Sequence, residues 1–457
     1  MSDDFVVLGG YADEEGGLAY LSDEDRRRSL YILGRSGTGK STLIHAMADS
    51  DLRRHRGFAL LDLHGDLAEQ IADTIPIDRE NSTIYVDPAD PAACLAFNPL
   101  HAVAPDARAL VASQIVEVFS HIWDLSPEAT PRLLFVLYNS LRLLLDAPAA
   151  TLLGIQRLLV DELWRRKLLT TCRDPAVRSF WEQQFGDLSD RDAALVASSL
   201  QNKVGMLLAG PLRSVLGQAR PTIDLRRVMD RGEALILNLS KAKLGEGPAR
   251  LLGSFMLSAF LQAAASRADT PESERRPFTL YCDEFHGYAH KGVLSGITES
   301  RKWGLVWVLS HQLLAQLPPL LARTVIGTIG SLIVFRIAGE DAESLQADLR
   351  NSDFVYDQTR LAHVNIAPPI NFANTPNFYA WAKLLDGGVP TETRLIATTP
   401  PAPAITGRFA AVRARSCARH MRPRELVEKE INHFLDPAPS TLDEVHMIVG
   451  RPRDRGR

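Results

Sequence analysis

Seven short apolar runs most strongly constrain the fold of this chain. Each is apolar at successive positions, whereas a strand with one face in water alternates apolar and polar residues. Strands buried on both faces of a parallel sheet have this pattern, and the segments between the runs have helical patterns. We therefore predict an α/β fold with a parallel sheet. The runs are residues 28–34, 57–62, 83–87, 233–238, 278–283, 304–310 and 331–336.

A different pattern separates the third and fourth runs. Residues 104–227 are rich in Leu, Ala and Arg with a 3.6-residue apolar period, which predicts an all-helical insertion domain between two halves of the α/β domain, residues 1–103 and 228–398. Within it we expect helices at 107–122, 131–145 and 192–208. Residues 399–457 begin with a proline-rich linker, and we expect a helix at 424–435 followed by a basic tail.

The first apolar run ends in Gly34-Arg-Ser-Gly-Thr-Gly-Lys-Ser41, and a helical pattern follows. This matches G-x-x-x-x-G-K-[ST] at the strand-to-helix junction that the motif requires, so an ordinary glycine-rich turn is a poor explanation. The glycines let backbone N–H groups converge on phosphate oxygens, Lys40 reaches the β- and γ-phosphates, and Ser41 can hold Mg²⁺. The predicted nucleotide-binding residues are Gly34, Ser36, Gly37, Thr38, Gly39, Lys40, Ser41 and Thr42.

Two carboxylates, Asp283 and Glu284, follow the run at 278–283. Phosphoryl transfer needs an acid at a strand terminus to hold the metal and a group that orients the attacking water. Asp283 suits the first task and Glu284 the second. Alone, the pair also describes a strand that leads into a solvated turn, but the phosphate loop upstream favours the catalytic interpretation.

Gln312 and Arg301 lie on either side of the run at 304–310. The carboxyl ends of parallel strands gather on the ligand side of a sheet, so Gln312 would face the γ-phosphate or the water beside it. It could equally be a polar residue that starts a loop. Arg301 precedes the strand and is either a surface residue or an arginine that completes the site of a neighbouring subunit.

Composition excludes several classes of protein. The 457 residues carry a net charge of −4 with 46% hydrophobic residues, so any contact with nucleic acid must use a local basic patch. The four cysteines have no zinc-site or disulfide spacing. We see no signal peptide, and the longest apolar runs are too short for a membrane span. We therefore expect a cytoplasmic protein.

Several elements together resemble the HerA–FtsK superfamily of P-loop motor ATPases, in particular the conjugative type IV coupling proteins (TraG/TraD-like). The features that carry the resemblance include the Walker A loop and the Walker B acid pair. They also include an arginine before a strand and the sequence Ser-His-Gln at the end of that strand. The helical insertion is similar to the all-α domain of the coupling proteins. The remaining elements are residues 60–66, 97–100, 300–302 and 310–312.

The resemblance implies a RecA/FtsK-like core, ATP with Mg²⁺ as cofactors, and a hexamer that moves DNA through a central channel. By position, Asp283 binds the metal, Glu284 activates water and Gln312 senses the γ-phosphate. Arg301 would act on the nucleotide of a neighbour, and Arg28, in the cluster 26–28, would be a second interface arginine or part of a solvated basic turn. Partners would include a membrane secretion channel and a relaxase or nuclease.

Coupling proteins usually carry N-terminal transmembrane helices, whereas this chain begins its ATPase pattern within about 30 residues of Met1. We expect it to act in the cytoplasm or to dock on a membrane partner. Residues 403–424 hold six arginines and no acid, and could bind DNA phosphates or form a solvated tail. Asp62 and His64 either contact the phosphate loop or stabilise their own turn.

Two alternatives to a DNA translocase stay open at this stage. One is an ATPase that delivers protein substrates to a secretion channel. The other is a HerA-like ATPase that works with a nuclease in repair or defence. Stimulation of ATP hydrolysis by DNA would argue against the first.

Overall fold

The computed structural model describes residues 5–186, 190–207, 209–351, 354–357, 362–365, 369–400 and 405–435. The chain forms two compact units. Unit 1 comprises Met1–Tyr85, Arg226–Asn238 and Phe260–Val412, and unit 2 comprises Val86–Leu225, Leu239–Ala259 and Arg413–Arg457. The domain boundaries predicted after residues 103, 227 and 398 differ from the bounds of these two units, and they stay predictions. The predicted basic tail after Leu435 lies outside the described residues.

Unit 1 is built on an eleven-stranded sheet. The strands from β10 to β7 in sheet order pair in parallel, and four antiparallel strands extend the sheet beyond β10. The fold is therefore a mostly parallel α/β sheet, as predicted. In sheet order the strands are β2 (Leu18–Ser22), β1 (Phe5–Tyr11), β16 (Arg394–Thr398), β13 (Tyr379–Lys383), β10 (Ser331–Val334), β3 (Leu30–Leu33), β9 (Leu305–His311), β8 (Phe278–Cys282), β4 (Gly57–Asp62), β7 (Ala234–Asn238) and β5 (Thr83–Val86).

All seven predicted apolar runs are strands of this sheet. The strands β3, β4, β5, β7, β8 and β9 are buried along their whole length, which explains why their sequences do not alternate. The antiparallel extension was not predicted. Its strands β2 and β13 are buried at every second residue, so their short alternating sequences lacked the signal used to find the others.

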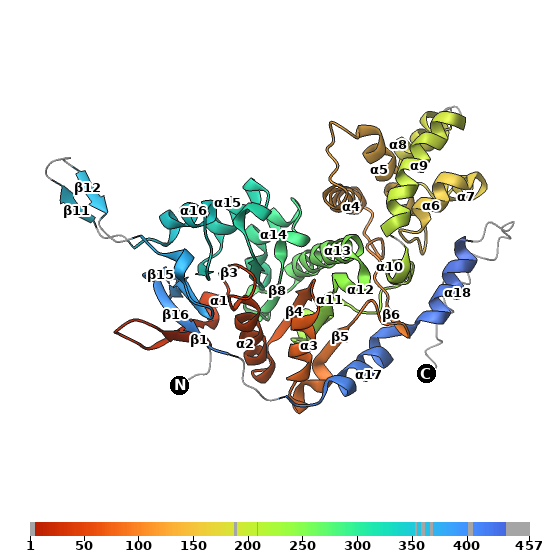
Figure 1. The fold of residues 1–457 in the computed structure, drawn as a ribbon. Helices are drawn as coiled ribbons and strands as arrows, with labels where there is room; N and C mark the ends of the chain where they lie inside the picture. Colours follow the sequence, from red (N-terminus) through yellow and green to blue (C-terminus); the bar gives the residue numbers. More distant parts are fainter. Residues whose placement is uncertain are drawn as a thin grey trace. The chain divides into compact units, whose positions relative to one another are not determined.

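Helices lie on both sides of the sheet in unit 1. Figure 1 shows α2 and α3 below the strands and α14 and α15 above them. Leu43 and Met47 of α2 and Ile71 of α3 share one core with Ile32 and Leu60 of the sheet. The helices of unit 1 are α1 (Asp23–Arg26), α2 (Lys40–Arg53), α3 (Asp66–Asp73), α11 (Leu225–Arg231), α14 (Val293–Glu299), α15 (Pro319–Thr328) and α16 (Glu340–Leu349). Two hairpins follow β10, formed by β11 (Phe354–Asp357) with β12 (Ala362–Asn365) and by β14 (Leu385–Asp386) with β15 (Val389–Pro390).

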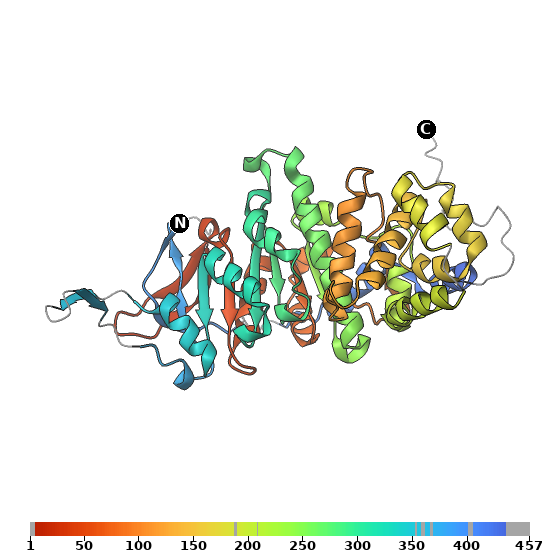
Figure 2. The ribbon, with the colours of Figure 1, turned by 90° about the horizontal axis from the view of Figure 1, so that it is seen from above.

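Unit 2 is mainly helical, and its first segment, Val86–Leu225, runs from orange to yellow-green in Figure 2. In the described part of residues 104–227 every regular element is a helix, which confirms the predicted all-α insertion. Its elements are β6 (Ala93–Leu95), α4 (Arg108–Ile122), α5 (Pro131–Asp146), α6 (Gly154–Val160), α7 (Glu162–Leu169), α8 (Pro175–Ser179), α9 (Asp190–Leu207), α10 (Gly210–Leu216), α12 (Lys241–Leu244), β17 (Met421–Pro423) and α18 (Arg424–Leu435). Helices α13 (Glu246–Ala265) and α17 (Phe409–His420) contribute residues to both units. In the part of the chain that the structure describes, no helix has both the length and the apolar character to span a membrane.

Candidate nucleotide site

The predicted phosphate loop runs from the end of β3 to the start of α2. Two of its glycines are required by close contacts. A Cβ on Gly34 would lie 2.5 Å from Cβ of Phe335, so no side chain fits there. Gly39 has φ of 121°, a conformation that L-residues rarely adopt, and its Cβ would approach the rings of Phe335 and Phe378.

The start of α2 can receive an anion. No side chain among the described residues caps this helix end, and its first turn contains no acidic residue, so the N–H groups and the positive end of the helix dipole are available. Arg35, Ser36 and Gly37 are exposed at the tip of the loop. The loop therefore fits the phosphates that its sequence motif predicts.

Side chains of the loop also contact its own backbone. Thr38 is buried and donates from Oγ1 to the carbonyl of Arg35 at 2.7 Å, and the Lys40 ammonium donates to the same carbonyl at 3.1 Å. Burial lowers the pKa of Lys40, and the nearby carboxylates of Asp283 and Glu284 counteract part of that effect.

Asp283 connects the ends of three strands. Its Oδ2 accepts a hydrogen bond from Ser41 Oγ at 3.2 Å, and its Oδ1 accepts one from Ser310 Oγ at 3.1 Å. Ser41 lies in the first turn of α2, which follows β3, Asp283 directly follows β8, and Ser310 lies near the end of β9. The three strands are neighbours in the sheet order β3-β9-β8. Burial, with the charges of Asp62 and Glu284, raises the pKa of Asp283 to about 6.

Glu284 is held by three side chains from different segments. Its Oε1 accepts a hydrogen bond from Gln312 Nε2 at 2.8 Å and lies 3.5 Å from His64 Nε2, and its Oε2 lies 3.3 Å from His286 Nδ1. Burial raises the pKa of this carboxyl, but the Gln312 hydrogen bond and the His286, Lys40 and His64 charges outweigh it, so the net pKa is lowered. Glu284 is therefore ionised at neutral pH, as a group that accepts a proton from water must be.

The segment after β9 is fixed by Gln316. Its Oε1 accepts hydrogen bonds from the backbone N–H groups of Gln312 and Leu313, and its Nε2 lies 3.4 Å from His286 Nε2. His311, just before Gln312, is fully buried beside the Tyr31 hydroxyl. Burial and the neighbouring His286 lower the pKa of His311 to about 3, so it is neutral and adds no charge to the site.

Several residues of this cluster were not predicted. Ser310 belongs to the Ser-His-Gln sequence named above, but no role was predicted for it. Its position at the end of a buried strand could have indicated that it faces the ligand side of the sheet. His286 and Gln316 are set by short turns that the sequence pattern does not describe. Phe378 covers Gly39 from the antiparallel extension, about 340 residues along the chain, and no local signal connects the two.

The predicted interface arginines lie at the other edge of the sheet. Arg301 is exposed in the turn before β9, and its guanidinium has no ion pair or hydrogen bond among the described residues. The seven residues of β9 separate it from Gln312 by roughly 20 Å. Arg28 precedes β3 and donates to the carbonyl of Gly388 at 3.0 Å. Neither arginine belongs to the acid cluster of its own chain, and their action across an interface stays a prediction.

Two other predicted elements make contacts within the chain, and their roles toward the phosphate loop or DNA stay predictions. Asp62 is fully buried and accepts hydrogen bonds from the backbone N–H groups of His64 and Ala68, so it stabilises the turn after β4. Each of the six arginines in residues 403–424 interacts with other residues of the chain. Arg408 pairs with Glu80, Arg413 with Asp90 and Arg422 with Glu430, and Arg424 donates to backbone carbonyls.

Two oxygen ligands are available for a metal ion. Among the described residues no cluster of three or more His, Cys, Asp or Glu side chains could hold a metal alone. Ser41 Oγ and Asp283 Oδ2 are in contact, however, and Mg²⁺ commonly takes only one or two protein ligands when phosphates and water supply the others. The donor set therefore fits a magnesium ion bound together with a nucleotide.

The fold has counterparts among solved structures. The plasmid coupling protein TrwB in complex with the non-hydrolysable ATP analogue ADPNP superposes with a TM-score of 0.62 and 16% identity, covering 84% of this chain and 88% of TrwB. TrwB in complex with ADP and Mg²⁺ gives a TM-score of 0.61 with 17% identity, covering 84% of this chain and 89% of that one. VirB4 of Thermoanaerobacter pseudethanolicus gives 0.55 with 14% identity, covering 88% and 98%.

These likenesses are structural. No protein-family model and no curated protein matches the sequence. The resemblance to type IV coupling ATPases is confirmed at the level of the fold, a P-loop sheet with an all-α insertion.

Proposed function

We propose that this chain is a Mg²⁺-dependent ATPase of a type IV secretion-related system. The observation that carries the proposal is the pair of contacts at the carboxyl edge of the sheet, Ser41 to Asp283 and Glu284 to Gln312. They bring the phosphate loop, a metal-binding acid, a water-activating acid and an amide into one cluster. P-loop ATPases require these groups, and the coupling protein TrwB, which has this fold, is recorded with ADP and Mg²⁺.

Each residue then has a separate task. The loop N–H groups and Lys40 bind the phosphates, while Ser41 and Asp283 hold Mg²⁺. Glu284, kept ionised by its neighbours, orients water and accepts its proton, and Gln312 fixes the Glu284 carboxylate. That Gln312 also senses the γ-phosphate stays part of the proposal. When bound, the nucleotide supplies the phosphoanhydride bond and Mg²⁺ neutralises the phosphate charge.

We further propose that the chain works as a hexamer that moves DNA through a central channel, in conjugation or a related transfer process. Arg301 supports this proposal because it is exposed, has no partner among the described residues, and lies at the edge away from the cluster. An arginine so placed can reach the nucleotide of a neighbouring subunit but not its own. TrwB is named in two of its solved structures as a bacterial conjugative coupling protein, which favours DNA as the cargo.

The test is ATP hydrolysis by the full chain with no DNA, single-stranded DNA or double-stranded DNA, at several salt concentrations. A DNA motor should hydrolyse faster with one form of DNA, and the stimulation should fall as salt rises, because phosphate contacts are screened. The Lys40→Ala variant is the control for contaminating ATPase. Hydrolysis that DNA leaves unchanged would contradict DNA translocation and favour a protein cargo, and absence of Lys40-dependent hydrolysis would contradict the ATPase assignment itself.

A further inference from the structure

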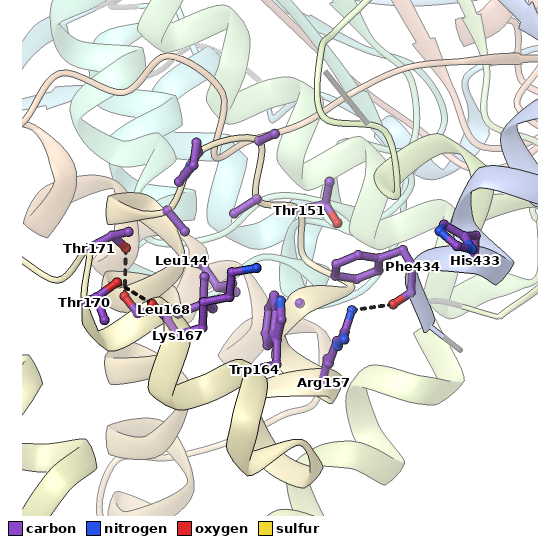
Figure 3. Close-up of a pocket in the computed structure, with 15 residues that line it drawn as sticks. Leu144, Thr151, Arg157, Trp164, Lys167, Leu168, Thr170, Thr171, His433 and Phe434 are labelled. Carbon is purple, nitrogen blue, oxygen red and sulfur yellow. Dashed lines mark hydrogen bonds between the residues drawn. The ribbon is translucent and has the colours of Figure 1, made fainter. Parts of the chain in front are cut away.

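Unit 2 contains a cavity of ≈ 190 Å³ that is separate from the nucleotide site. Figure 3 shows its walls, formed by the end of α5 with the segment after it, by α6 and α7, and by the end of α18. Thr151 and Gly154 are buried in its floor, while Trp164, Lys167 and Phe434 are half-buried, so the cavity reaches the surface.

The lining residues that the structure describes are mainly apolar and include no carboxylate. A pocket with apolar walls and a few polar groups is typical of small-ligand sites. The Thr170 and Thr171 hydroxyls donate to backbone carbonyls at 2.7 Å. The main polar groups of the lining are therefore the cations of Arg157 and Lys167. The lining residues are Leu144, Ala147, Pro148, Ala149, Ala150, Thr151, Gly154, Arg157, Trp164, Lys167, Leu168, Thr170, Thr171, His433 and Phe434.

One wall is held rigidly by Arg157. Its guanidinium carbon lies 5.1 Å from the ring centre of Trp164 and 5.3 Å from that of Phe434. The same group pairs with Asp161 at 3.0 Å and donates to the carbonyl of Phe434 at 2.8 Å. The two aromatic rings are thus fixed before any ligand arrives, which lowers the entropic cost of binding.

A second cation, Lys167, lines the cavity. Lys167 lies on α7, and Figure 3 shows its amino group directed between Leu144 and Trp164. Its ammonium has no ion pair or hydrogen bond among the residues that the structure describes. A half-buried charge beside apolar walls is unfavourable unless an opposite charge accompanies it.

Part of the cavity volume exists because residue 154 is a glycine without a side chain. A Cβ at this position would lie 2.7 Å from Cδ2 of Leu144 and 3.2 Å from the ring of Trp164. Any larger residue would push these walls into the cavity. The absence of a side chain here therefore keeps the apolar floor open.

We propose that this cavity binds a small amphipathic acid, an aromatic or branched aliphatic group next to one carboxylate. The apolar group lies against Leu144, Trp164 and Phe434, and the carboxylate pairs with Lys167. A cationic ligand is excluded by Lys167 and Arg157, and a polyphosphate would need more unpaired donors than the lining offers. The carboxylate belongs either to a free metabolite-sized acid or to the C-terminal residue of a polypeptide.

The experiment measures binding to the full chain by isothermal titration calorimetry, without nucleotide. The probes are N-acetyl-phenylalanine, N-acetyl-leucine and the pentapeptide acetyl-Ala-Ala-Ala-Ala-Phe, each compared with its C-terminal amide. We expect at least one acid to bind with Kd below about 1 mM and its amide to bind about tenfold more weakly, because the amide lacks the charge that Lys167 pairs with. Binding by the pentapeptide alone identifies a polypeptide C-terminus as the source, and binding by the single amino acids identifies a small acid.

Variants test the residue assignment. Lys167→Gln should weaken the acid about tenfold and remove the difference between acid and amide, while Lys167→Arg should restore it. The matched control is Arg166→Gln, which removes a cation from the same helix that pairs with Glu162 outside the cavity. Gly154→Leu should abolish binding by filling the space.

Three results would overturn the proposal. They are absence of saturable binding by every acid, equal binding of acid and amide, and binding that Lys167→Gln leaves unchanged. Circular dichroism of each variant verifies that it is folded, and Lys167→Gln, which removes no ion pair or hydrogen bond among the described residues, should fold normally. Because the readout is ligand binding without ATP, its outcome is independent of the ATPase proposal.

Discussion

The two edges of the sheet in unit 1 hold charged residues in opposite arrangements. At the amino edge, Arg26 is buried and makes two 2.8 Å hydrogen bonds to Asp51, which also accepts from the Tyr281 hydroxyl. At the carboxyl edge, Asp283 and Glu284 are adjacent acids whose charges repel, and burial raises the pKa of Asp283. Charges at the first edge neutralise each other, whereas those at the second are crowded.

This difference separates stability from function. A buried charge with a matched partner contributes to one folded structure, and removing either partner leaves an uncompensated charge. Crowded like charges cost stability and persist where a bound group of opposite charge uses them. We therefore expect substitutions at the amino edge to act on folding and substitutions at the carboxyl edge to act on catalysis. Arg301 is an exception at the amino edge, because it is exposed and has no partner among the described residues.

The largest expected effect is at the carboxyl edge. Glu284→Gln should lower the rate of ATP hydrolysis by about 10³-fold and leave ATP binding intact, because the amide keeps the shape but cannot accept a proton. Lys40→Ala should abolish both ATP hydrolysis and ATP binding. Hydrolysis and binding of a fluorescent ATP analogue are measured in parallel. Hydrolysis by Glu284→Gln at the wild-type rate would contradict the assignment of the water-activating residue.

Arg301 tests the exception at the amino edge. Arg301→Ala should reduce hydrolysis by about 10²-fold or more without changing stability, since an arginine supplied to a neighbour stabilises the transition-state charge. Lys302→Ala, its exposed neighbour that pairs with Glu299, is the control. Mixing Arg301→Ala with Lys40→Ala subunits should restore part of the activity. If mixed oligomers form and no activity returns, the action across an interface is wrong.

Asp51 tests the matched pair. Asp51→Asn should lower the free energy of unfolding by about 3–5 kcal/mol, because Arg26 would stay buried without its counter-charge. Arg53→Gln, on the same helix and in a partly exposed pair with Asp49, should change it by less than about 1 kcal/mol. Urea denaturation measures both. If Asp51→Asn and Arg53→Gln lower the free energy of unfolding equally, the buried pair at the amino edge has no special role in stability.

The smallest expected effect is a pH-dependent gain at Asp283. Its pKa is about 6 in the folded chain and 3.8 unfolded, so ionisation above pH 6 costs stability and protonation relieves that cost as the pH falls. Asp283→Asn should therefore stabilise the chain by about 1–2 kcal/mol at pH 8, and the gain should shrink toward pH 5. Urea denaturation in EDTA at both pH values measures it. An equal gain in stability at pH 8 and pH 5 would show that the ionised Asp283 carboxylate is not the cause of the gain.

The parallel strands and the helices of unit 2 could be predicted because each is determined by a local pattern. Buried strands such as β4 and β8 are apolar throughout, and α18 begins and ends where its 3.6-residue period does. The phosphate loop and the acid pair were found because their motifs are contiguous. The antiparallel extension escaped because its strands are short and half-buried, and Phe378 reaches Gly39 only through that extension.

The sequence alone therefore determined which residue types stand at strand ends and which loop can bind phosphate. The tertiary structure decided which of them meet. The order β3-β9-β8 brings Ser41, Ser310 and Asp283 together, and the same packing gives the arginines before the strands different surroundings, Arg26 buried against Asp51 and Arg301 exposed. Strand order depends on contacts between segments far apart in the chain, and so do the burial of Arg26 and the pKa of Asp283. A local motif carries no information on any of them.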